Sequence, residues 1–338
     1  MKPASHVATT PFWEEAKPSR RYPKVSGNER ADVVVIGGGI TGVTAAYLLA
    51  KAGASVVLLE RHRIGTVDTG HTSAHLTMVL DTPLSTLVSR FGRDHSRAAW
   101  DAGLAAIDQI EQIVAEESID CDFERVPGYL HVPLTDTDDD GSDLKKEADL
   151  ASELGFSAEF VAKVPLVGRP GVKFDDQARF HPAKYLAGVL NAIERMNGRV
   201  FEESGVDEFL TDPKGVKAHG YTIDSPFAVI ATHTPLLGSR TTSQGTLFQT
   251  KLALYSSYVL SSRVPKGSQP DALMWDTASP YHYYRLSPDR DADVVVYGGC
   301  DHKTGQGDSV KAFEELEGDL SRLIANAEAT HHWSGQVI

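Results

Sequence analysis

The sequence predicts an α/β protein with two domains, one built on a parallel sheet and one, of the α+β kind, on an antiparallel sheet. A strand, a glycine cluster, a helix and a second strand follow one another within residues 31–60. Strand-like runs of alternating character occupy much of the later sequence. A late helix followed by "AVIATHTP" (228–235) indicates that the chain returns to the first domain. At 338 residues the chain has room for about two domains.

The first unit is the sharpest local pattern. "ADVVVIG" is a short, continuous β-branched run, which is typical of a strand buried on both faces of a parallel sheet. "TGVTAAYLLAKAG" has helical spacing, and Gly53 is placed to end the helix. "SVVLLE" is the next strand, so the stretch forms one βαβ unit.

The later elements follow from periodicity and capping residues. Residues 83–118 have helical spacing with a break near Phe91 and Gly92, and a second helix begins at Ser142 or Asp143 and ends at Gly155. The remaining expected elements are a strand over 123–134, a helix over 181–198, strands over 199–210, 221–232 and 251–262, a hairpin from 281–286 and 291–300, and a helix over 309–327.

This order predicts the domain boundaries. We expect a polar arm over residues 1–28, a discontinuous parallel-sheet domain over 28–118 and 176–238, and a second domain over 119–175 and 239–330.

Composition excludes several classes of function. Thirty-three basic and 46 acidic residues give a net charge of −13, which argues against a nucleic-acid surface. No apolar run approaches the ~20 residues of a membrane span. Cys121 and Cys300 lack CxxC spacing and are expected to be buried thiols in a reducing compartment. No hydrophobic stretch follows the twin arginine at Arg20 and Arg21, so a cytoplasmic location is expected.

The glycine cluster indicates a Rossmann-like, dinucleotide-binding turn. Gly37, Gly39 and Gly42 form GxGxxG between a strand and a helix, the setting in which the backbone and the helix N-terminus can hold a pyrophosphate. Glu60 ends the second strand 18 residues after Gly42, where an acid can accept hydrogen bonds from a ribose.

Either FAD or a nicotinamide cofactor would suit these residues. After Glu60 the chain runs through "RHRIGTVDTGHTSAHLTMVL", a loop rich in small residues rather than a further βα unit. Such a loop favours an extended, permanently bound FAD, and a nicotinamide-dependent dehydrogenase is the alternative.

Several longer stretches resemble one family. "DVVVIGGGITGVTAAYLLAKAGASVVLLER", "GHTSAHLT", "HPAKYLAGVL", "AVIATHTP" and "YGGCDHKTGQ" are similar to the FAD-dependent D-amino-acid-oxidase/glycine-oxidase superfamily (DAO, with a GR2-type FAD domain). The similarity is greatest to its bacterial branch that often carries a C-terminal Rieske domain, and it extends from about Pro11 to the end of the chain.

The resemblance implies the cofactor-binding residues. The turn would hold the FAD pyrophosphate, Glu60 and Arg61 the adenosine, and the Thr72–His75 loop would run beside the flavin. The backbone of Val206 would meet the adenine. The implied cofactor-binding set is Gly37, Gly38, Gly39, Ile40, Thr41, Gly42, Glu60, Arg61, Thr72, Ser73, Ala74, Val206, Ala231 and Thr232.

The resemblance also implies the reaction, which is oxidation of an amine or amino acid by hydride transfer to flavin N5, with oxygen, a quinone or a redox protein as the electron acceptor. Arg285 is the candidate that binds a substrate carboxylate, with Tyr283 or Tyr284 as its partner and His75 lining the flavin. The alternative for Arg285 is an ordinary strand residue.

No metal site is expected. An EF-hand pattern over residues 136–147 follows a strand rather than a helix and has Asp143 where an apolar residue is needed, so an acidic turn that caps a helix explains it. His71 with His75, and His331 with His332, lack a third ligand at a recognisable spacing.

Two features concern the end of the sequence. Residues 1–338 contain no C-x-H…C-x-x-H pair, so no Rieske cluster is expected within them. In the family a similar "WSGQ" leads into a further segment of the FAD domain, so residues 331–338 are expected to begin that segment. A third hypothesis is therefore a shortened, inactive FAD-binding or scaffold protein.

Overall fold

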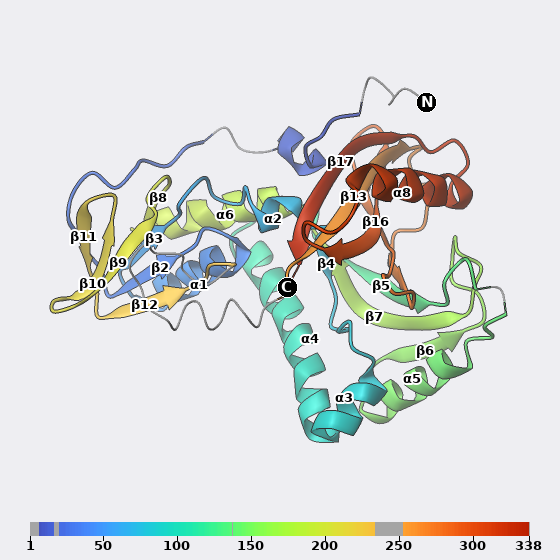
Figure 1. Cartoon of the computed structure of the whole chain (residues 1–338). Helices are drawn as coiled ribbons and strands as arrows, with labels where there is room; N and C mark the ends of the chain where they lie inside the picture. The colour runs from blue at the N-terminus through green and yellow to red at the C-terminus, as the bar shows by residue number, and fades with distance from the viewer. Residues whose placement is uncertain (1–6, 17–19, 137, 234–252, 338) are drawn as a thin grey trace.

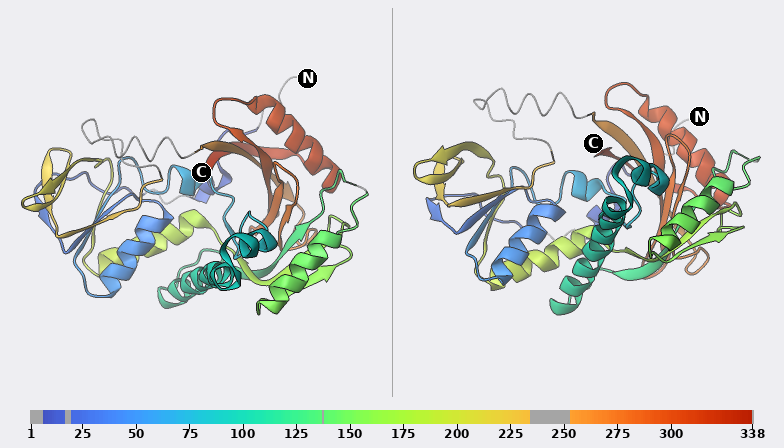
Figure 2. Two further views of the ribbon diagram at one scale, coloured as in Figure 1. Left: turned by 60° about the horizontal axis from the view of Figure 1, so that its bottom comes forward. Right: turned by 90° about the horizontal axis from the view of Figure 1, so that it is seen from below.

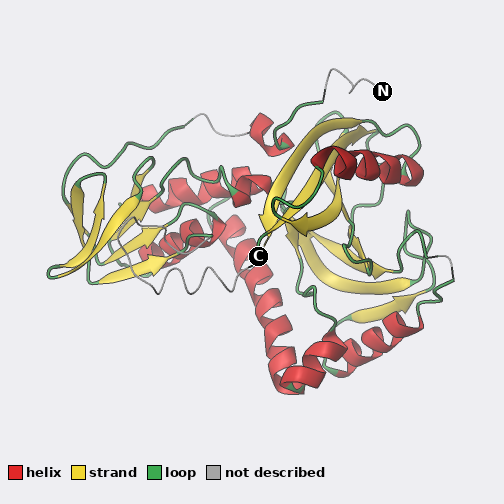
Figure 3. Ribbon diagram, in the orientation of Figure 1, coloured by secondary structure: helices red, strands yellow, loops and turns green. Residues whose placement is uncertain are grey.

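The computed structural model describes residues 7–16, 20–136, 138–233 and 253–337. Figure 1 shows a parallel-sheet part and a larger antiparallel-sheet part lying side by side, and the two further views of Figure 2 agree. Figure 3 shows that each part combines strands with covering helices, as expected of the α/β and α+β classes. Among the described helices, none is both long enough and apolar enough to cross a membrane.

The parallel-sheet part contains the expected βαβ unit. All pairings in its sheet are parallel, and every residue of β2 and β3 is buried. The strand order is β12 (Phe227–Ile230), β2 (Val33–Ile36), β3 (Val56–Leu59), β8 (Arg199–Phe201). The two strands beside β2 are thus β3, which follows it directly, and β12, which comes about 170 residues after β3. The chain therefore leaves this sheet and returns to it, as the sequence indicated.

Both faces of this sheet are covered. Val33 and Val35 pack in one core with helices α1 (Ile40–Lys51) and α6 (Pro182–Arg195). Val34 and Ile36 pack on the opposite face against a small second sheet. That sheet consists of β1 (Glu29–Arg30), β11 (Tyr221–Asp224), β10 (Lys214–Ala218) and β9 (Val206–Thr211). Burial on both faces explains the unbroken β-branched run.

The larger part is a nine-stranded sheet in which all pairs are antiparallel except β14 with β5. The expected hairpin is present as β15 paired with β16. The strands in order are β17 (Ala329–Val337), β13 (Tyr255–Val264), β16 (Asp293–Lys303), β15 (Tyr283–Pro288), β14 (Leu273–Asp276), β5 (Glu124–His131), β7 (Gly171–Arg179) and β4 (His75–Leu76), with β6 (Ala158–Val161) on β7.

The helices match the sequence pattern closely. The break expected near Gly92 separates α3 (Leu84–Phe91) from α4 (Arg93–Glu116), and Gly92 adopts a φ of 81°, which glycine tolerates best. Ile113 of α4 packs in the core of the parallel-sheet part, while Trp100 packs beside α5 (Ser142–Glu153), so α4 bridges the two parts. Helix α8 (Ser309–Leu323) covers β13 and β16, and α2 (Asp68–His71) is one short turn.

Three segments lie differently from the boundaries that the sequence suggested. Residues 329–337 form β17 and pair with β13 in the larger sheet, rather than beginning a further segment of the FAD domain. Strand β7 runs over residues 171–179, across the suggested boundary at 175/176. In the expected surface arm, Trp13 is only 1% exposed and belongs to the main core. Both cysteines are free and buried, as expected.

Candidate functional site

The glycine turn is built by close backbone approach. Gly37 has a φ of +111°, and a Cβ there would lie 2.6 Å from the Ala231 carbonyl oxygen. A Cβ on Gly42 would overlap the carbonyl oxygen of Gly37. These two glycines therefore let the ends of β2 and β12 meet the first turn of α1.

Glu60 connects this turn to the end of β3. Its carboxylate accepts the Gly38 N–H at 2.7 Å and the His62 N–H at 2.7 Å, one on each oxygen. The Ile40 N–H donates to Thr69 Oγ1 at 3.1 Å, so the loop after Glu60 also reaches the helix N-terminus. The acid at the strand end is thus held beside the turn, with lone pairs left for a ligand.

A cavity of about 750 Å³, here called the dinucleotide cavity, runs along these residues. Its volume is within the roughly 300–1,000 Å³ typical of small-molecule sites. The candidate residues that line it are Gly37, Gly39, Ile40, Thr41, Glu60, Arg61, Thr72, Ala74, His75, Val206, Ala231 and Thr232. Gly38, Gly42 and Ser73 do not line it; the two glycines lie within the turn.

The residues of the dinucleotide cavity fit an extended dinucleotide. Glu60, Arg61 and Val206 line it together with the glycine turn and the loop at Thr72 and Ala74. The N-terminus of α1 brings backbone N–H groups and a partial positive charge to this wall, which suits a pyrophosphate.

A second cavity of about 490 Å³, the inner cavity, shares Asp68, Thr72, His75 and His233 with the first. The shared residues make the two cavities neighbours. More of its wall comes from the segment after β3, including His71 and Asp81. The larger sheet and its loops add Ser257, Val259, Trp275, Tyr281, Tyr283, Asp301 and residues 335–337. The end of β17 reaches this wall, since Trp333 Nε1 donates to the His71 carbonyl at 2.9 Å.

His75 and Tyr283 lie together in the wall of the inner cavity, edge to face, with ring centroids 5.6 Å apart. His75 Nε2 lies 3.0 Å from the Tyr284 carbonyl and so carries the proton, which leaves Nδ1 to accept from Ser73 Oγ at 3.1 Å. Burial lowers the pKa of His75 to about 3, so its ring is neutral at neutral pH. Burial also raises the pKa of Tyr283, whose hydroxyl lies 3.0 Å from Ser257 Oγ.

Arg285 does not line either cavity. Its Nη1 donates to the carbonyls of Ala74 at 2.7 Å, Phe180 at 3.1 Å and Ser73 at 3.3 Å, and its guanidinium lies 5.2 Å from the centre of the Trp13 ring. The residue is 1% exposed, and burial lowers its pKa to about 9. This position does not favour the expected role in binding a substrate carboxylate. Its contacts instead support a role in positioning the loop at Ser73 and Ala74.

Tyr284, the other suggested partner of Arg285, lies away from the cavity. It is 3% exposed, and its hydroxyl donates to the Pro270 carbonyl at 3.3 Å. Of the two suggested tyrosines, only Tyr283 faces the inner cavity.

Three carboxylates of the inner cavity were not singled out in the sequence. Asp68, Asp81 and Asp301 all line it, and the described lining residues include no lysine or arginine. Burial, together with the nearby Asp81 carboxylate, raises the pKa of Asp301. Asp68 Oδ2 also lies 3.3 Å from His233 Nδ1. No local motif marks these residues, because the loop after β3 and the bulged end of β16 bring them together only in three dimensions.

A glycine turn with an acid on the next strand, beside a neighbouring cavity, is typical of dinucleotide-dependent oxidoreductases. The model of the family described as "FAD dependent oxidoreductase" (DAO) matches residues 32–337, and the chain belongs to this family. Its cofactor is therefore FAD, and the nicotinamide alternative is set aside.

Relatives agree with this assignment. The chain is 28% identical over 330 residues to a Bacillus subtilis protein whose name includes "Rieske 2Fe-2S iron-sulfur protein YhfW", covering 96% of this chain and 63% of that protein. It is 27% identical over 282 residues to gamma-glutamylputrescine oxidoreductase of Escherichia coli, covering 79% and 64%. The chain thus spans less than two thirds of the length of both relatives.

Solved structures share the fold. Glycine oxidase from Geobacillus kaustophilus superposes with a TM-score of 0.68 at 16% identity, over 91% of this chain and 83% of that one. The chain is thus an FAD-dependent oxidoreductase of the DAO family, related to amine and amino-acid oxidases.

Proposed function

We propose that the protein oxidises a cationic amine, with FAD in the dinucleotide cavity and the amine in the inner cavity. The observation that carries this proposal is the charge of the inner cavity, which Asp68, Asp81 and Asp301 all line and to which the described lining residues supply no lysine or arginine. An alkylamine is protonated at neutral pH, and it is attracted by carboxylates, of which Asp68 and Asp301 are partly buried and Asp81 is exposed. A free carboxylate on the substrate would instead be repelled.

The residues around the dinucleotide cavity would hold FAD in the way their chemistry suggests. Glu60 and Arg61 are placed for the adenosine, the Gly37–Gly42 turn for the pyrophosphate, and Thr72 with Ala74 for the end nearest the inner cavity. When bound, FAD supplies at its N5 atom the acceptor for the hydride that leaves the carbon bearing the amine.

The chain's own residues would bind and deprotonate the amine. A protonated amine has no free nitrogen lone pair, so it must lose a proton before its neighbouring carbon can release a hydride. Asp68 holds Nδ1 of His233 at 3.3 Å, which leaves Nε2 of that ring as a proton acceptor. His233 lines both cavities and is therefore suitably placed for this step.

The remaining candidate residues have supporting roles in this proposal. Neutral His75 and Tyr283 form an uncharged wall that excludes water beside the reacting carbon. Arg285 positions Ser73 and Ala74 through their carbonyls. The E. coli relative is named for the oxidation of an amine derivative, which supports an amine as the substrate class. Oxygen, a quinone or a redox protein as electron acceptor, and a cytoplasmic location, stay predictions.

The test is an anaerobic substrate screen of the purified protein. Flavin content is first measured after denaturation, and bleaching of the bound flavin is then followed with diamines, monoamines and α-amino acids of matched chain length. We expect diamines and monoamines to bleach the flavin and α-amino acids to do so far more slowly. Bleaching by amino acids alone would overturn the amine assignment. Bound FAD that no amine or amino acid reduces would favour the inactive scaffold hypothesis.

A further inference from the structure

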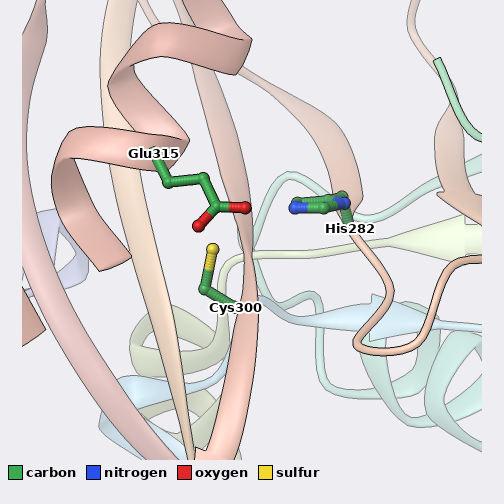
Figure 4. A group of neighbouring side chains, drawn as sticks. All are labelled: His282, Cys300 and Glu315. Carbon is green, nitrogen blue, oxygen red and sulfur yellow. The ribbon is translucent and has the colours of Figure 1, made fainter. Parts of the chain in front are cut away.

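One side-chain cluster lies outside both cavities. His282, Cys300 and Glu315 each offer a ligand atom, and these atoms all lie within 4.8 Å of one another. Figure 4 shows the three side chains pointing toward one another, with Glu315 coming from helix α8. His282 immediately precedes β15, and Cys300 lies in β16. Three separate elements therefore converge on one point.

The His282 ring is held in the orientation that a metal ligand needs. Asp276 Oδ2 lies 3.2 Å from Nδ1, and Asp276 Oδ1 in turn accepts the backbone N–H groups of Ala278 and His282 at 3.0 Å each. A carboxylate on one ring nitrogen fixes the proton there and makes the other nitrogen the ligand, as in carboxylate–histidine–zinc arrangements.

Nε2 of His282 is the ring atom left to face Cys300 and Glu315. It is buried and has no nitrogen or oxygen hydrogen-bond partner within geometric limits among the described residues, while the Cys300 sulfur lies beside it and, with Asp276, raises the pKa of His282 against the effect of burial. The Asp319 carboxylate is the nearest acidic group to Nε2, with Oδ2 at 3.6 Å, which is beyond hydrogen-bond distance. A buried ring nitrogen whose nearest partner is a thiol sulfur, with carboxylates close by, is a setting that a bound cation would satisfy.

The chemistry of the donor set indicates which cation. Imidazole nitrogen, thiolate sulfur and carboxylate oxygen form a mixed set that suits zinc, whereas calcium and magnesium prefer oxygen alone. Around a tetrahedral zinc the ligand atoms lie roughly 3.3–3.8 Å apart. The three ligand atoms are now up to 4.8 Å apart, so they would have to move about 1 Å closer to reach that range. Glu315 lies on an exposed part of α8 and has freedom to move.

We propose that His282 Nε2, Cys300 Sγ and Glu315 form a zinc-type divalent metal site, with Asp276 orienting His282 and Asp319 beside the fourth position. Binding forms the Zn–N, Zn–S and Zn–O bonds and releases the Cys300 thiol proton, together with any proton on Nε2, so no oxidant or reductant is required.

The position of the site suggests what it would do. Tyr283 and Asp301, the residues that follow His282 and Cys300, line the inner cavity. A metal ion would tie the start of β15 and the bulged end of β16 to α8 and so hold these two cavity residues in place. The site is structural in this account and takes no part in the oxidation itself.

The experiment uses the whole chain, first stripped of metal with a chelator and then titrated with cobalt(II) and with zinc. A cobalt–thiolate bond gives a charge-transfer absorption band in the near ultraviolet, which reports Cys300 directly. Cys300→Ser removes the sulfur, Glu315→Gln the carboxylate and Asp276→Asn the orienting group. Glu314→Gln, one residue away on α8, is the matched control.

We expect the unmodified protein to bind one cobalt ion with the thiolate band and zinc to displace it. Cys300→Ser should lose the band, Asp276→Asn should bind about 10–100-fold more weakly, and Glu314→Gln should behave as the unmodified protein. Zinc should also raise the thermal midpoint of the unmodified protein but not that of Cys300→Ser. No bound metal, or metal binding with an unchanged spectrum in Cys300→Ser, would overturn the proposal and leave His282 as an imidazolium between Asp276 and Asp319.

Discussion

The two neighbouring cavities are built in different ways. Most of the dinucleotide cavity comes from one continuous stretch, residues 36–76, with short contributions near Val206 and Ala231. The inner cavity draws on the loop after β3, strands β13 to β17 and the loops between them. A cavity lined by residues close together in the sequence can be recognised from a sequence motif. A cavity lined by residues from distant loops cannot.

The cavities also differ in charge. The dinucleotide cavity includes Arg61, Arg63 and the N-terminus of α1, which suit an anionic pyrophosphate. The inner cavity holds three aspartates. We therefore propose that the first cavity takes an anionic group and the second a cationic one, and this contrast can be tested by changing each cavity separately.

The largest effect should come from filling the glycine turn. In Gly42→Ala the new methyl group would overlap the Gly37 carbonyl, so β2 and α1 must move apart. We expect FAD binding to be lost and the free energy of unfolding to fall by about 1–3 kcal/mol or more. Flavin content after gel filtration and chemical denaturation measure the two effects.

Gly53→Ala is the matched control for that change. Gly53 also has a positive φ, +90°, but a Cβ there meets nothing within 4 Å. The control should lose some stability through backbone strain and keep its flavin. If both variants retain FAD equally, close approach at Gly42 is not what builds the turn.

The expected effect at Gly42 follows from a local sequence motif, and local motifs are what the sequence could predict. The glycines of the strand–glycine–helix unit lie within six residues of one another, and Glu60 follows 18 residues after Gly42, so the glycine turn and the acid could be predicted from their spacing alone. For the EF-hand-like stretch the expected order of elements is present, since strand β5 precedes it and helix α5 begins at Ser142.

The role of Arg285 could not be derived in that way. The sequence places it on a strand near tyrosines but does not say which face of the strand meets the cavity. The structure buries its guanidinium against Ser73, Ala74 and Phe180, residues more than 100 positions away. The acidic residues of the inner cavity and the His282–Cys300–Glu315 cluster are equally long-range, and no spacing rule finds them.

Replacing Arg285 should give the second-largest effect and test its positioning role. Arg285→Met leaves the carbonyls of Ala74 and Phe180 without their donor, and we expect a loss of about 3 kcal/mol of stability together with weaker FAD binding. Denaturant unfolding and flavin titration measure these changes. Unchanged stability and flavin affinity, with a raised KM for amino acids alone, would instead support the carboxylate-binding role.

A smaller and more selective effect is expected in the inner cavity. Asp301→Asn removes one of three negative charges without touching a residue that lines the dinucleotide cavity. We expect kcat/KM for cationic amines to fall about 10–100-fold, or roughly 1.4–2.8 kcal/mol, while flavin content stays unchanged.

Asp289→Asn is the control for Asp301, because Asp289 is exposed and lies outside both cavities. It should leave kcat/KM as it is. An Asp301→Asn protein that oxidises amines as well as the unmodified protein would remove the electrostatic basis for a cationic substrate.

The most gradual effect is on stability at mildly acidic pH, through buried His181 and partly buried His75. Burial lowers the pKa of His75 to about 3 and that of His181, with a contribution from nearby Lys184, to about 4, against 6.5 for a free ring. Below pH 6.5 the unfolded chain therefore binds more protons than the folded one, and stability falls as the pH falls. Each histidine contributes a slope of about 1.4 kcal/mol per pH unit between 6.5 and its folded pKa.

Chemical denaturation at pH 7, 6 and 5 measures this slope, and His75→Asn should remove about half of it. His95→Asn, at an exposed position on α4, is the control and should leave the slope unchanged. His75 lines both cavities, whereas the His181 ring centroid lies 5.0 Å from that of Trp13 in the core. A pH slope that survives in His75→Asn would therefore locate the pH sensitivity in the core rather than at the cavity wall.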